Sequence, residues 1–443
     1  MRIVIVGAGE VGTAIAENLA ADHHVVVVER DPQLVEELTY SLDVLPIHGD
    51  GTELEALAEA GVADADLVIA ATDVDEVNVV VCGTTRTISD AFTIARVKRP
   101  SLLETWQDAD GAYGVDFMVS TDLLTAEAIH RISGLSGARD VDTFAGGLVR
   151  MAEFEISPDS PLIGQTVEQT DRYDSMTVGG LFRDDLIVAS GDQRFCDGDR
   201  IVVIGSPDSI RTFAADVSPG DDVGASDIVI VGGSSIGHQT ARLFEREGHR
   251  PRLIESDPDR ARELAEDLPN TVVVEIDGTD RQSLLEEHVG KADLVVTCLD
   301  SDEKNLLAAL LAGTVGVDRT VALVETPAYA DLFETVGVDV AIDPREEAAE
   351  EIVRFTRDSQ PDNVAMIEHD RAEVLERTLT AESPLVDSTV QSAAETLPEG
   401  VVIGAITRAG DLVTPRGDTV FEVGDHVIFF LDADVLDAVS ERI

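Results

Sequence analysis

The sequence opens with MRIVIVGAGEVG over residues 1–12, an apolar run that leads into a glycine-rich turn. The run predicts a buried β-strand, and the turn matches the pattern G-x-G-x-x-G. Such a loop needs glycines because the chain must turn tightly, approach a pyrophosphate without a Cβ in the way, and pack a helix against the strand. A helix beginning near Val11 would direct its N–H groups at the phosphates. The predicted phosphate-binding loop comprises Gly7, Ala8, Gly9, Glu10, Val11 and Gly12.

The loop belongs to a segment in which short apolar runs alternate with helical stretches. Runs that are apolar throughout and separated by helix-length segments indicate a parallel sheet covered by helices on both faces. We therefore predict a doubly wound, Rossmann-like α/β lobe. The expected strands are Ile3–Val6, Val25–Val28, Val44–Ile47, Leu67–Ala71, Thr93–Val97 and Phe117–Val119.

The chain contains this segment twice. The run at residues 3–7 recurs at residues 228–232, and further short motifs recur in the same order at an offset of about 226 residues. A shorter unit also repeats, with Ser-Pro-Leu at residues 160–162 and again at residues 383–385. Its short strands and Gly-Asp turns predict a small α+β lobe. The units therefore follow one another in the order A-B-A-B.

Four domains follow from this order, two of each kind. The composition of residues 218–225, rich in Pro, Gly and Asp, indicates a linker between the halves. Linkers inside the halves are expected near residues 136–142 and 358–362. The predicted domains are residues 1–135, 140–217, 226–355 and 362–443.

Composition limits the partners of the chain. The 87 acidic residues against 32 Lys and Arg produce a formal net charge of −55, which argues against nucleic acid or anionic lipid as a general partner. Charges repel one another over about 8 Å in ordinary cytosol but only about 3 Å in molar salt. We expect a salt-rich cytoplasm and hence a halophilic source.

The reactive residues show no recognisable catalytic or metal pattern. The three cysteines, Cys82, Cys196 and Cys298, form no C-x-x-C pair, which favours a reducing cytoplasm. No H-E-x-x-H, P-loop, G-x-S-x-G or metal-ligand cluster is present, so we expect no catalytic residues and no metal site. The start of the chain leaves no room for a signal peptide, and the longest apolar stretch, 306–317, is too short to span a bilayer.

Glu29 identifies the ligand that the first glycine loop is expected to hold. It lies 22 residues beyond Gly7, at the end of the second predicted strand, where a carboxylate accepts hydrogen bonds from the hydroxyls of an adenosine ribose. Because a carboxylate repels a 2′-phosphate, we favour NAD(H) over NADP(H), although neighbouring Arg30 weakens that preference. ATP and ADP carry the same ribose and stay open as ligands.

Four further polar residues fall at the carboxyl ends of predicted parallel strands, where ligands sit in open α/β sheets. Asp50 could contact the adenine end, whereas Thr72 and Asp73 could line the phosphate or nicotinamide side. Both aspartates could instead cap the helices that follow. Arg96 could clamp phosphates bidentately, or form only a salt bridge with a carboxylate.

On these residues and on the A-B-A-B order, the chain resembles the TrkA family of cytosolic regulatory subunits of potassium-uptake systems. The resemblance covers nearly the whole chain. It implies that each A unit is an RCK N-terminal lobe that binds nucleotide and each B unit an RCK C-terminal lobe. It also implies a homo-oligomeric ring, peripheral on the inner face of the membrane, that gates potassium uptake through a Trk-type integral-membrane subunit. The NAD(H) site that it implies contains Gly7, Gly9, Gly12, Glu29, Asp50, Thr72, Asp73 and Arg96.

The second A unit departs from this pattern. Ser234 stands where the close-approach glycine belongs, Leu299 stands opposite Thr72, and Leu323 stands opposite Arg96. We therefore predict one competent dinucleotide site and one site that is weaker or of different specificity. The residues that the second site retains are Gly232, Gly237, Glu255 and Asp277.

Two other functions share the glycine loop. An NAD-dependent dehydrogenase should add an acid–base group at the nicotinamide, and none of the nine histidines lies in a hydride-transfer pattern. A regulator of potassium efflux or of another cation transporter would use the same lobes. The sequence therefore predicts a regulator and not an enzyme, and only the resemblance points to uptake.

Overall fold

A computed structural model describes residues 1–21, 23–109, 112–135, 137–183, 185–217, 227–357, 364–367, 371–398, 400–435 and 438–439. The chain divides into two compact units, one of residues 1–129 with 227–355 and one of residues 130–226 with 356–443. The linkers expected at 218–225 and 358–362 lie outside the described residues.

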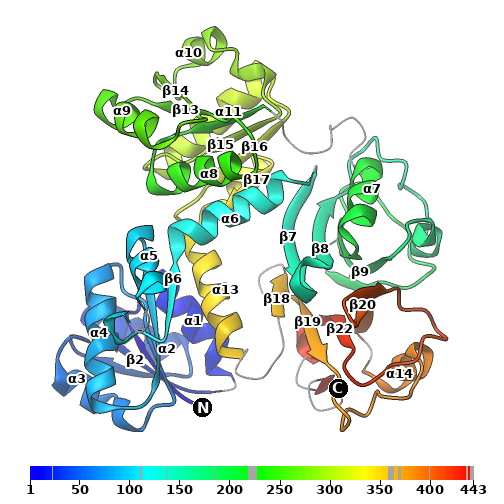
Figure 1. The fold of residues 1–443 in the computed structure, drawn as a ribbon, viewed down its shortest axis with the longest axis horizontal. Coiled ribbons are helices and arrows are strands. Elements are labelled where there is room, and N and C mark those ends of the chain that lie inside the picture. The colour runs from blue at the N-terminus through cyan, green and yellow to red at the C-terminus, as the bar shows by residue number, and fades with distance from the viewer. Residues whose placement is uncertain are drawn as a thin grey trace. The chain divides into compact units, whose positions relative to one another are not determined.

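The first lobe of the first unit is a six-stranded parallel sheet in the order β3-β2-β1-β4-β5-β6 (Figure 1). This is the doubly wound fold that the sequence predicts, with the chain reversing direction across the sheet between β1 and β4. Its strands are β1 (Arg2–Val6), β2 (His24–Glu29), β3 (Leu45–His48), β4 (Leu67–Ala70), β5 (Phe92–Val97) and β6 (Phe117–Ser120). Its helices are α1 (Glu10–Ala20), α2 (Pro32–Ser41), α3 (Leu54–Glu59), α4 (Asp75–Ile88), α5 (Pro100–Asp108) and α6 (Thr121–Ser133).

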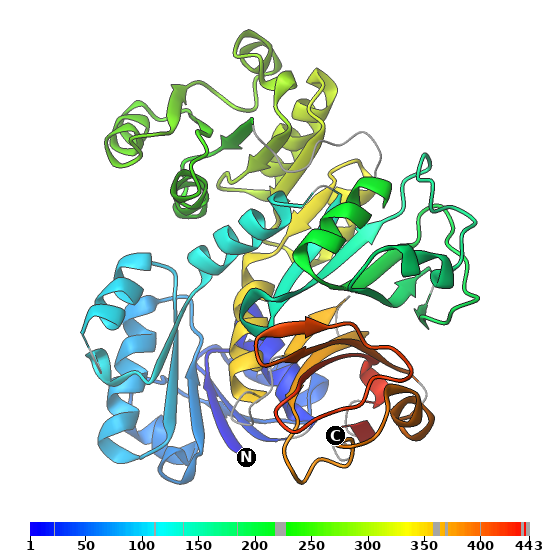
Figure 2. The ribbon, with the colours of Figure 1, turned by 45° about the vertical axis from the view of Figure 1, so that its right-hand side comes forward.

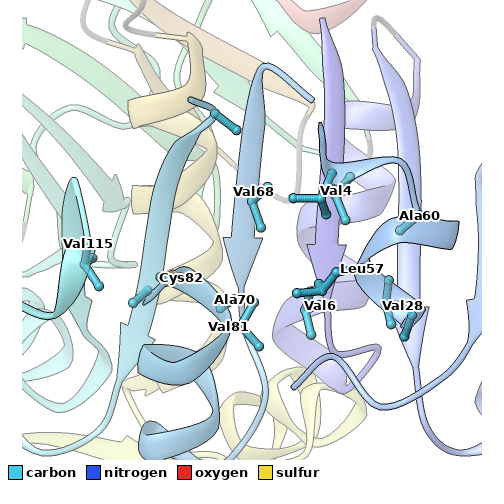
Figure 3. Close-up of a cluster of buried hydrophobic side chains, with 14 of the residues drawn as sticks. Val4, Val6, Val28, Leu57, Ala60, Val68, Ala70, Val81, Cys82 and Val115 are labelled. Atoms are coloured by element: carbon cyan, nitrogen blue, oxygen red, sulfur yellow. The ribbon is translucent and has the colours of Figure 1, made fainter. Parts of the chain in front are cut away.

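The apolar strand residues form the core beneath these helices. Figure 3 shows Val4, Val6 and Val68 pointing into one cluster that Leu57 and Val81 join from the helices. These side chains are fully or almost fully buried. Burying branched aliphatic side chains from adjacent strands holds the helices against the sheet, and because its strands are parallel, their carboxyl ends lie at one edge.

The second lobe repeats this architecture, with the strand order β14-β13-β12-β15-β16-β17. The repeat in the sequence is therefore a repeat of the fold. Its strands are β12 (Ile228–Val231), β13 (Arg252–Glu255), β14 (Val272–Glu275), β15 (Leu294–Thr297), β16 (Arg319–Leu323) and β17 (Val340–Ile342). Its helices are α8 (Ser235–Arg246), α9 (Pro258–Asp267), α10 (Arg281–Glu286), α11 (Asp302–Val315), α12 (Ala330–Thr335) and α13 (Pro344–Arg357).

The last helix of the second lobe packs on the first lobe. Helix α13 (yellow) lies beside the blue and cyan elements in Figure 1. The ring of Phe355 stacks on Phe117 at a centroid distance of 4.0 Å and on Phe92 at 5.3 Å. Stacked aromatic rings add stabilisation beyond the area they bury, so this contact ties the two lobes together within the first unit.

The second unit contains two five-stranded sheets, with orders β10-β9-β11-β8-β7 and β18-β19-β22-β20-β21. The segment expected to be a linker near 136–142 is largely strand β7 instead, because its backbone pairs antiparallel with β8. The elements are β7 (Ala138–Phe144), β8 (Val149–Glu155), β9 (Met176–Phe182), β10 (Leu186–Val188), β11 (Arg200–Gly205), α7 (Pro207–Val217), β18 (Val364–Ile367), β19 (Ala372–Thr378), α14 (Val390–Thr396), β20 (Val401–Arg408), β21 (Asp411–Val413) and β22 (His426–Asp432).

These two sheets share one core. In Figure 2 the orange and red strands face the green sheet, and Phe182, Ile204 and Phe430 belong to one buried cluster. A Cβ at Gly179 or Gly180 would lie within 2.7 Å or 2.6 Å of the Phe430 ring. Two glycines therefore make room for that ring, and the core of the second unit needs both halves of the chain.

The Gly-Asp turns that the sequence singles out serve this fold. Asp199 is buried and accepts bonds from Nε and Nη2 of Arg183, both at 2.7 Å. Asp425 repeats the arrangement with Nε and Nη2 of Arg408, at 2.7 and 2.8 Å. Bidentate pairing satisfies a buried carboxylate. Each aspartate also accepts from the backbone N–H three residues before it, of Cys196 and of Glu422, and this bond closes the turn.

Candidate functional site

The carboxyl ends of β1, β2, β3 and β4 enclose a cleft with a volume of about 250 Å³. Six of the sequence-predicted residues meet there, although they lie on four different loops. The lining residues are Val6, Gly7, Gly9, Val28, Glu29, Arg30, Asp31, Leu34, Gly49, Asp50, Gly51, Thr72, Asp73, Val74 and Val77.

The three glycines of the loop have different structural roles. Gly7 has a φ of +105°, a conformation that favours glycine. A Cβ on Gly12 would lie 2.0 Å from the Gly7 carbonyl oxygen, so Gly12 lets α1 pack against the loop. A Cβ on Gly9 would meet nothing closer than Asp73 Oδ2, at 3.9 Å. Gly9 therefore keeps space open in the cleft.

The N-terminus of α1 faces this open space without a side-chain cap. Its N-cap residue is Gly9, Glu10 begins the helix, and Val11 is buried beneath it. The first N–H groups of a helix carry a partial positive charge and require acceptors. This end of α1 is therefore suited to an anionic ligand such as a phosphate.

Glu29 braces the loop from the end of β2. Its Oε2 accepts a hydrogen bond from the backbone N–H of Ala8 at 2.7 Å, and its Oε1 accepts one from Asp31 at 2.8 Å. Each carboxylate oxygen can accept a second bond, so Glu29 could also receive ribose hydroxyls.

Asp50 lies at the adjacent strand end, and its pKa is lowered by bonds from the hydroxyl and then the backbone N–H of Thr52. It forms no cap, since the N-cap of α3 is Glu53. The N-cap of α4 is Val74, so Asp73 is not its cap either. The helix-capping alternative for the two aspartates is therefore wrong.

Thr72, Asp73 and Arg96 form one polar group at the carboxyl ends of β4 and β5. Arg96 is 2% exposed, donates from Nε to Thr121 Oγ1 at 2.9 Å, and pairs with Asp73 at 3.4 Å. Partial burial alone would raise the pKa of Asp73, but the charges of Lys98 and Arg96 outweigh it and hold the pKa below its usual value. The salt-bridge alternative for Arg96 is thus realised, and Arg96 does not line the cleft itself.

Sequence reasoning missed several residues of this site. Asn78 is fully buried, accepts from the N–H and hydroxyl of Thr72, and donates to the carbonyls of Thr72 and Arg96. It therefore fixes the loop after β4. Lys98 approaches Asp73 at 3.4 Å. Asn78 recurs in the second half of the chain as Asn305, and this repeat could have identified it as a site residue. The apolar residues of the cleft wall, Leu34, Val74 and Val77, belong to no motif.

The second lobe keeps the backbone of this site. Gly232 has a φ of +111°, and a Cβ on Gly237 would lie 2.1 Å from the Gly232 carbonyl oxygen. Glu255 accepts from the N–H of Gly233 at 2.8 Å, as Glu29 does from Ala8. Asp277 accepts from the N–H and hydroxyl of Thr279, as Asp50 does from Thr52, and these bonds lower the pKa of Asp277.

Its helix ends and walls differ. The hydroxyl of Ser234 caps α8 by accepting from Gly237 N–H at 3.3 Å, and Ser301 caps α11. Aligning Asp31-Pro32 with Asp257-Pro258 and Asn78 with Asn305 places Arg260 opposite Leu34 and Lys304 opposite Val77. Two apolar wall positions of the first cleft are thus occupied by cations in the second lobe.

Within the described ranges, no cluster of three or more His, Cys, Asp or Glu side chains is arranged to hold a metal ion. None of the helices in that part of the chain is both long and apolar enough to cross a bilayer.

Known proteins share this architecture. The chain matches the TrkA-N domain over residues 3–121 and 228–344 and the TrkA-C domain over residues 151–217 and 374–443. It is 35% identical over 454 residues to Trk system potassium uptake protein TrkA homolog 1 of Methanosarcina mazei, covering 100% of this chain and 99% of that relative. Among solved structures, the GsuK RCK domain has a TM-score of 0.62 at 18% identity, covering 100% of this chain and 94% of that one. The GsuK channel bound to NAD has a TM-score of 0.61 at 19% identity, covering 100% and 78%. At such identities the structural likeness shows the fold alone.

Proposed function

This chain belongs to the TrkA family of tandem TrkA-N and TrkA-C proteins, and on that premise we propose that it binds NAD(H) in the first-lobe cleft and gates potassium uptake. The observation that carries the proposal is the uncapped N-terminus of α1 above the open space at Gly9. A dinucleotide pyrophosphate fits this cradle because its charge satisfies N–H groups that no side chain caps.

The chain's own residues would bind the ligand as follows. Gly9 would allow the backbone to approach the pyrophosphate, Gly7 and Gly12 would shape the loop that carries it, and Glu29 would accept the hydroxyls of the adenosine ribose. Asp50 would lie toward the adenine end of the ligand, with Thr72, Asp73 and Arg96 on its phosphate side. ATP and ADP share the adenosine half, so the same cleft would accept them. We assign the corresponding loops of the second lobe, with Gly232, Gly237, Glu255 and Asp277, a weaker or different nucleotide affinity.

The residue types that line the cleft do not favour a dehydrogenase. Of the described residues that line it, none is a histidine, lysine, tyrosine or cysteine. Proton transfer at a substrate most often uses a histidine, and three carboxylates that line the cleft, Glu29, Asp50 and Asp73, are the ones assigned here to the nucleotide. The Methanosarcina mazei relative is named a potassium uptake protein, which favours regulation of uptake over regulation of efflux or of another cation transporter.

Gating would operate as a shift between two populations. We propose that subunits form a ring against the inner membrane face, where they contact a Trk-type integral-membrane subunit. Nucleotide in the first cleft would favour one arrangement of that ring. Moving a two-state equilibrium from 1:99 to 99:1 requires about 5.5 kcal/mol of differential affinity, which several subunits can supply together.

The test is potassium uptake in a strain that lacks this gene. We expect the restored wild-type copy to raise uptake and Gly9→Leu to abolish that rescue, because leucine fills the open space of the cleft. Ser234→Leu, at the corresponding position of the second lobe, is the matched control and should retain most of the rescue. Uptake that is indifferent to the restored gene would overturn the proposal.

The acidic composition supports a proposal about the milieu. A net charge of −55 destabilises the folded chain through self-repulsion unless salt screens it. We propose that the protein works in a salt-rich cytoplasm. Unfolding followed by circular dichroism should show a melting temperature that rises steeply between 0.1 M and about 2 M KCl. A melting temperature that is constant over this range would refute the halophilic assignment.

A further inference from the structure

A side chain of the second lobe reaches the glycine loop of the first. Arg345, in the first turn of α13, forms an ion pair with Glu10 through its Nη1 and donates from the same atom to the Glu325 carbonyl at 2.6 Å. Its side chain is only 28% exposed. Glu10 begins α1, so the guanidinium stands beside the helix end that the proposed function assigns to phosphates.

The reverse contact exists between α6 and the second lobe. Asp122, in the first turn of α6, is hydrogen-bonded by Ser235, which occupies the position in its loop that Glu10 occupies in the first. Each of these two helices therefore places its first turn against the glycine loop of the other lobe. The charges differ, because the second loop receives a carboxylate and the first receives a cation.

The guanidinium of Arg345 affects the relative affinities of the first cleft for ATP and NAD(H). The carboxylate of Glu10 repels phosphates at the same helix end that attracts them, and pairing with Arg345 neutralises it. Beyond its second phosphate, ATP continues with another phosphate, whereas NAD(H) continues with a ribose and a nicotinamide ring that carries no negative charge. A guanidinium at this place therefore interacts more favourably with ATP.

We propose that Arg345 makes the first nucleotide site distinguish nucleoside triphosphates from NAD(H). Its guanidinium would exchange the carboxylate of Glu10 for the terminal phosphate of the triphosphate. The inference rests on the proposed function of this cleft and adds the basis on which it ranks its ligands. Because Arg345 belongs to the second lobe, the exchange also makes the contact between the lobes depend on which nucleotide is bound.

The experiment compares Arg345→Gln with Arg242→Gln in the full-length chain at molar KCl. Arg242 pairs with Glu104 across the same two lobes at 3.7 Å, but it lies on α8 and its partner on α5, outside the cleft lining. Calorimetry should show ATP binding weakened about tenfold or more by Arg345→Gln, with NADH binding changed less than about twofold. Arg242→Gln should leave both affinities, and their ratio, as in the wild type.

Two further variants separate the outcomes. Arg345→Lys keeps the charge and should retain part of the preference, and Glu10→Gln removes the competing carboxylate and should strengthen ATP binding. Equal weakening of ATP and NADH by Arg345→Gln, or the same effect from Arg242→Gln, would overturn the role of Arg345 while leaving the nucleotide site intact. A wild-type chain that binds neither nucleotide would overturn the proposed function and this inference together.

Discussion

The two Rossmann-like lobes of this chain share a backbone and differ in what occupies the ends of their helices. In the first lobe, α1 begins at a glycine that provides no cap, whereas Ser234 caps α8 in the second. The same contrast separates α4, whose N-cap is Val74, from α11, which Ser301 caps. A hydroxyl that satisfies a helix N-terminus removes the reason for an anion to bind there. The first lobe therefore keeps helix N–H donors at α1 and α4 without a side-chain cap, and the second lobe does not at α8 and α11.

The cleft walls reinforce this contrast. Leu34 and Val77 offer the first cleft apolar surface, as an adenine ring prefers. Their counterparts are already engaged, because Arg260 donates to the Gly233 carbonyl at 2.8 Å and Lys304 to Asp300 at 2.7 Å. A ligand entering the second lobe would have to compete with these interactions.

The strongest test of the comparison imposes the second lobe's serine on the first. Gly9→Ser should weaken NADH binding about 100-fold, because the hydroxyl can cap α1 and the side chain enters the space for the pyrophosphate. Calorimetry measures the affinity. The melting temperature should change little, since a Cβ at Gly9 meets only Asp73, at 3.9 Å. An affinity within threefold of the wild type would show that the bare helix end does not matter.

The edge strands β6 and β17 of the two parallel sheets differ in one buried residue at their carboxyl ends. Asp343 follows β17, where the first lobe has the buried Ser120, and burial raises the pKa of Asp343 to about 6. Between about pH 4 and pH 6 the folded chain therefore binds a proton that the unfolded chain releases, so stability falls as pH rises through that window.

In the wild type, Asp343 accepts a hydrogen bond from the backbone N–H of Arg345 at 2.8 Å. Asp343→Asn removes the negative charge but retains an oxygen that can accept this bond. At pH 7 the variant should be more stable than the wild type by about 2 kcal/mol, and the difference should vanish below about pH 4. Denaturant unfolding at both pH values measures it. A difference that is the same at pH 4 and pH 7 would contradict the assignment to Asp343.

The ribose contact is the next test in size. Glu29→Gln should weaken NADH binding about tenfold, because hydrogen bonds from ribose hydroxyls to a charged acceptor are stronger than those to an amide. The matched variant Glu255→Gln alters the corresponding residue and should leave the tight site unchanged. If both substitutions reduce the same binding event equally, the two lobes contribute to one site and the asymmetry is wrong.

The smallest effect is expected from the reciprocal change. Ser234→Gly removes the cap from α8 and should cost only a few tenths of a kcal/mol of stability. It should raise nucleotide affinity at the second lobe no more than a few-fold, because Arg260 and Lys304 remain. A second site as tight as the first, detected as doubled stoichiometry in calorimetry, would show that the serine alone determines the difference.

The periodic features of the sequence predicted the fold correctly, and the resemblance carried by its motifs and unit order predicted the family correctly. Apolar runs repeated at helix-length intervals indicated the parallel strands, and the A-B-A-B order corresponds to two parallel and two antiparallel sheets among the described residues. The exceptions are informative. Residues 138–144 lack an uninterrupted apolar run, yet they form β7 because β8 offers its edge for pairing. The predicted domain boundaries and the NAD(H) role of the site residues stay predictions.

The sequence by itself determined where the glycines, Glu29 and the strand ends would meet, because these features are local and strand ends converge in any doubly wound sheet. Only the tertiary structure decided which polar groups have internal partners. Asn78 is hydrogen-bonded to Thr72. Arg96 donates to Thr121 and pairs with Asp73. Arg345 pairs with Glu10 from the other lobe. Such pairings join residues far apart in the chain, and their geometry depends on how the core packs, which no local pattern records.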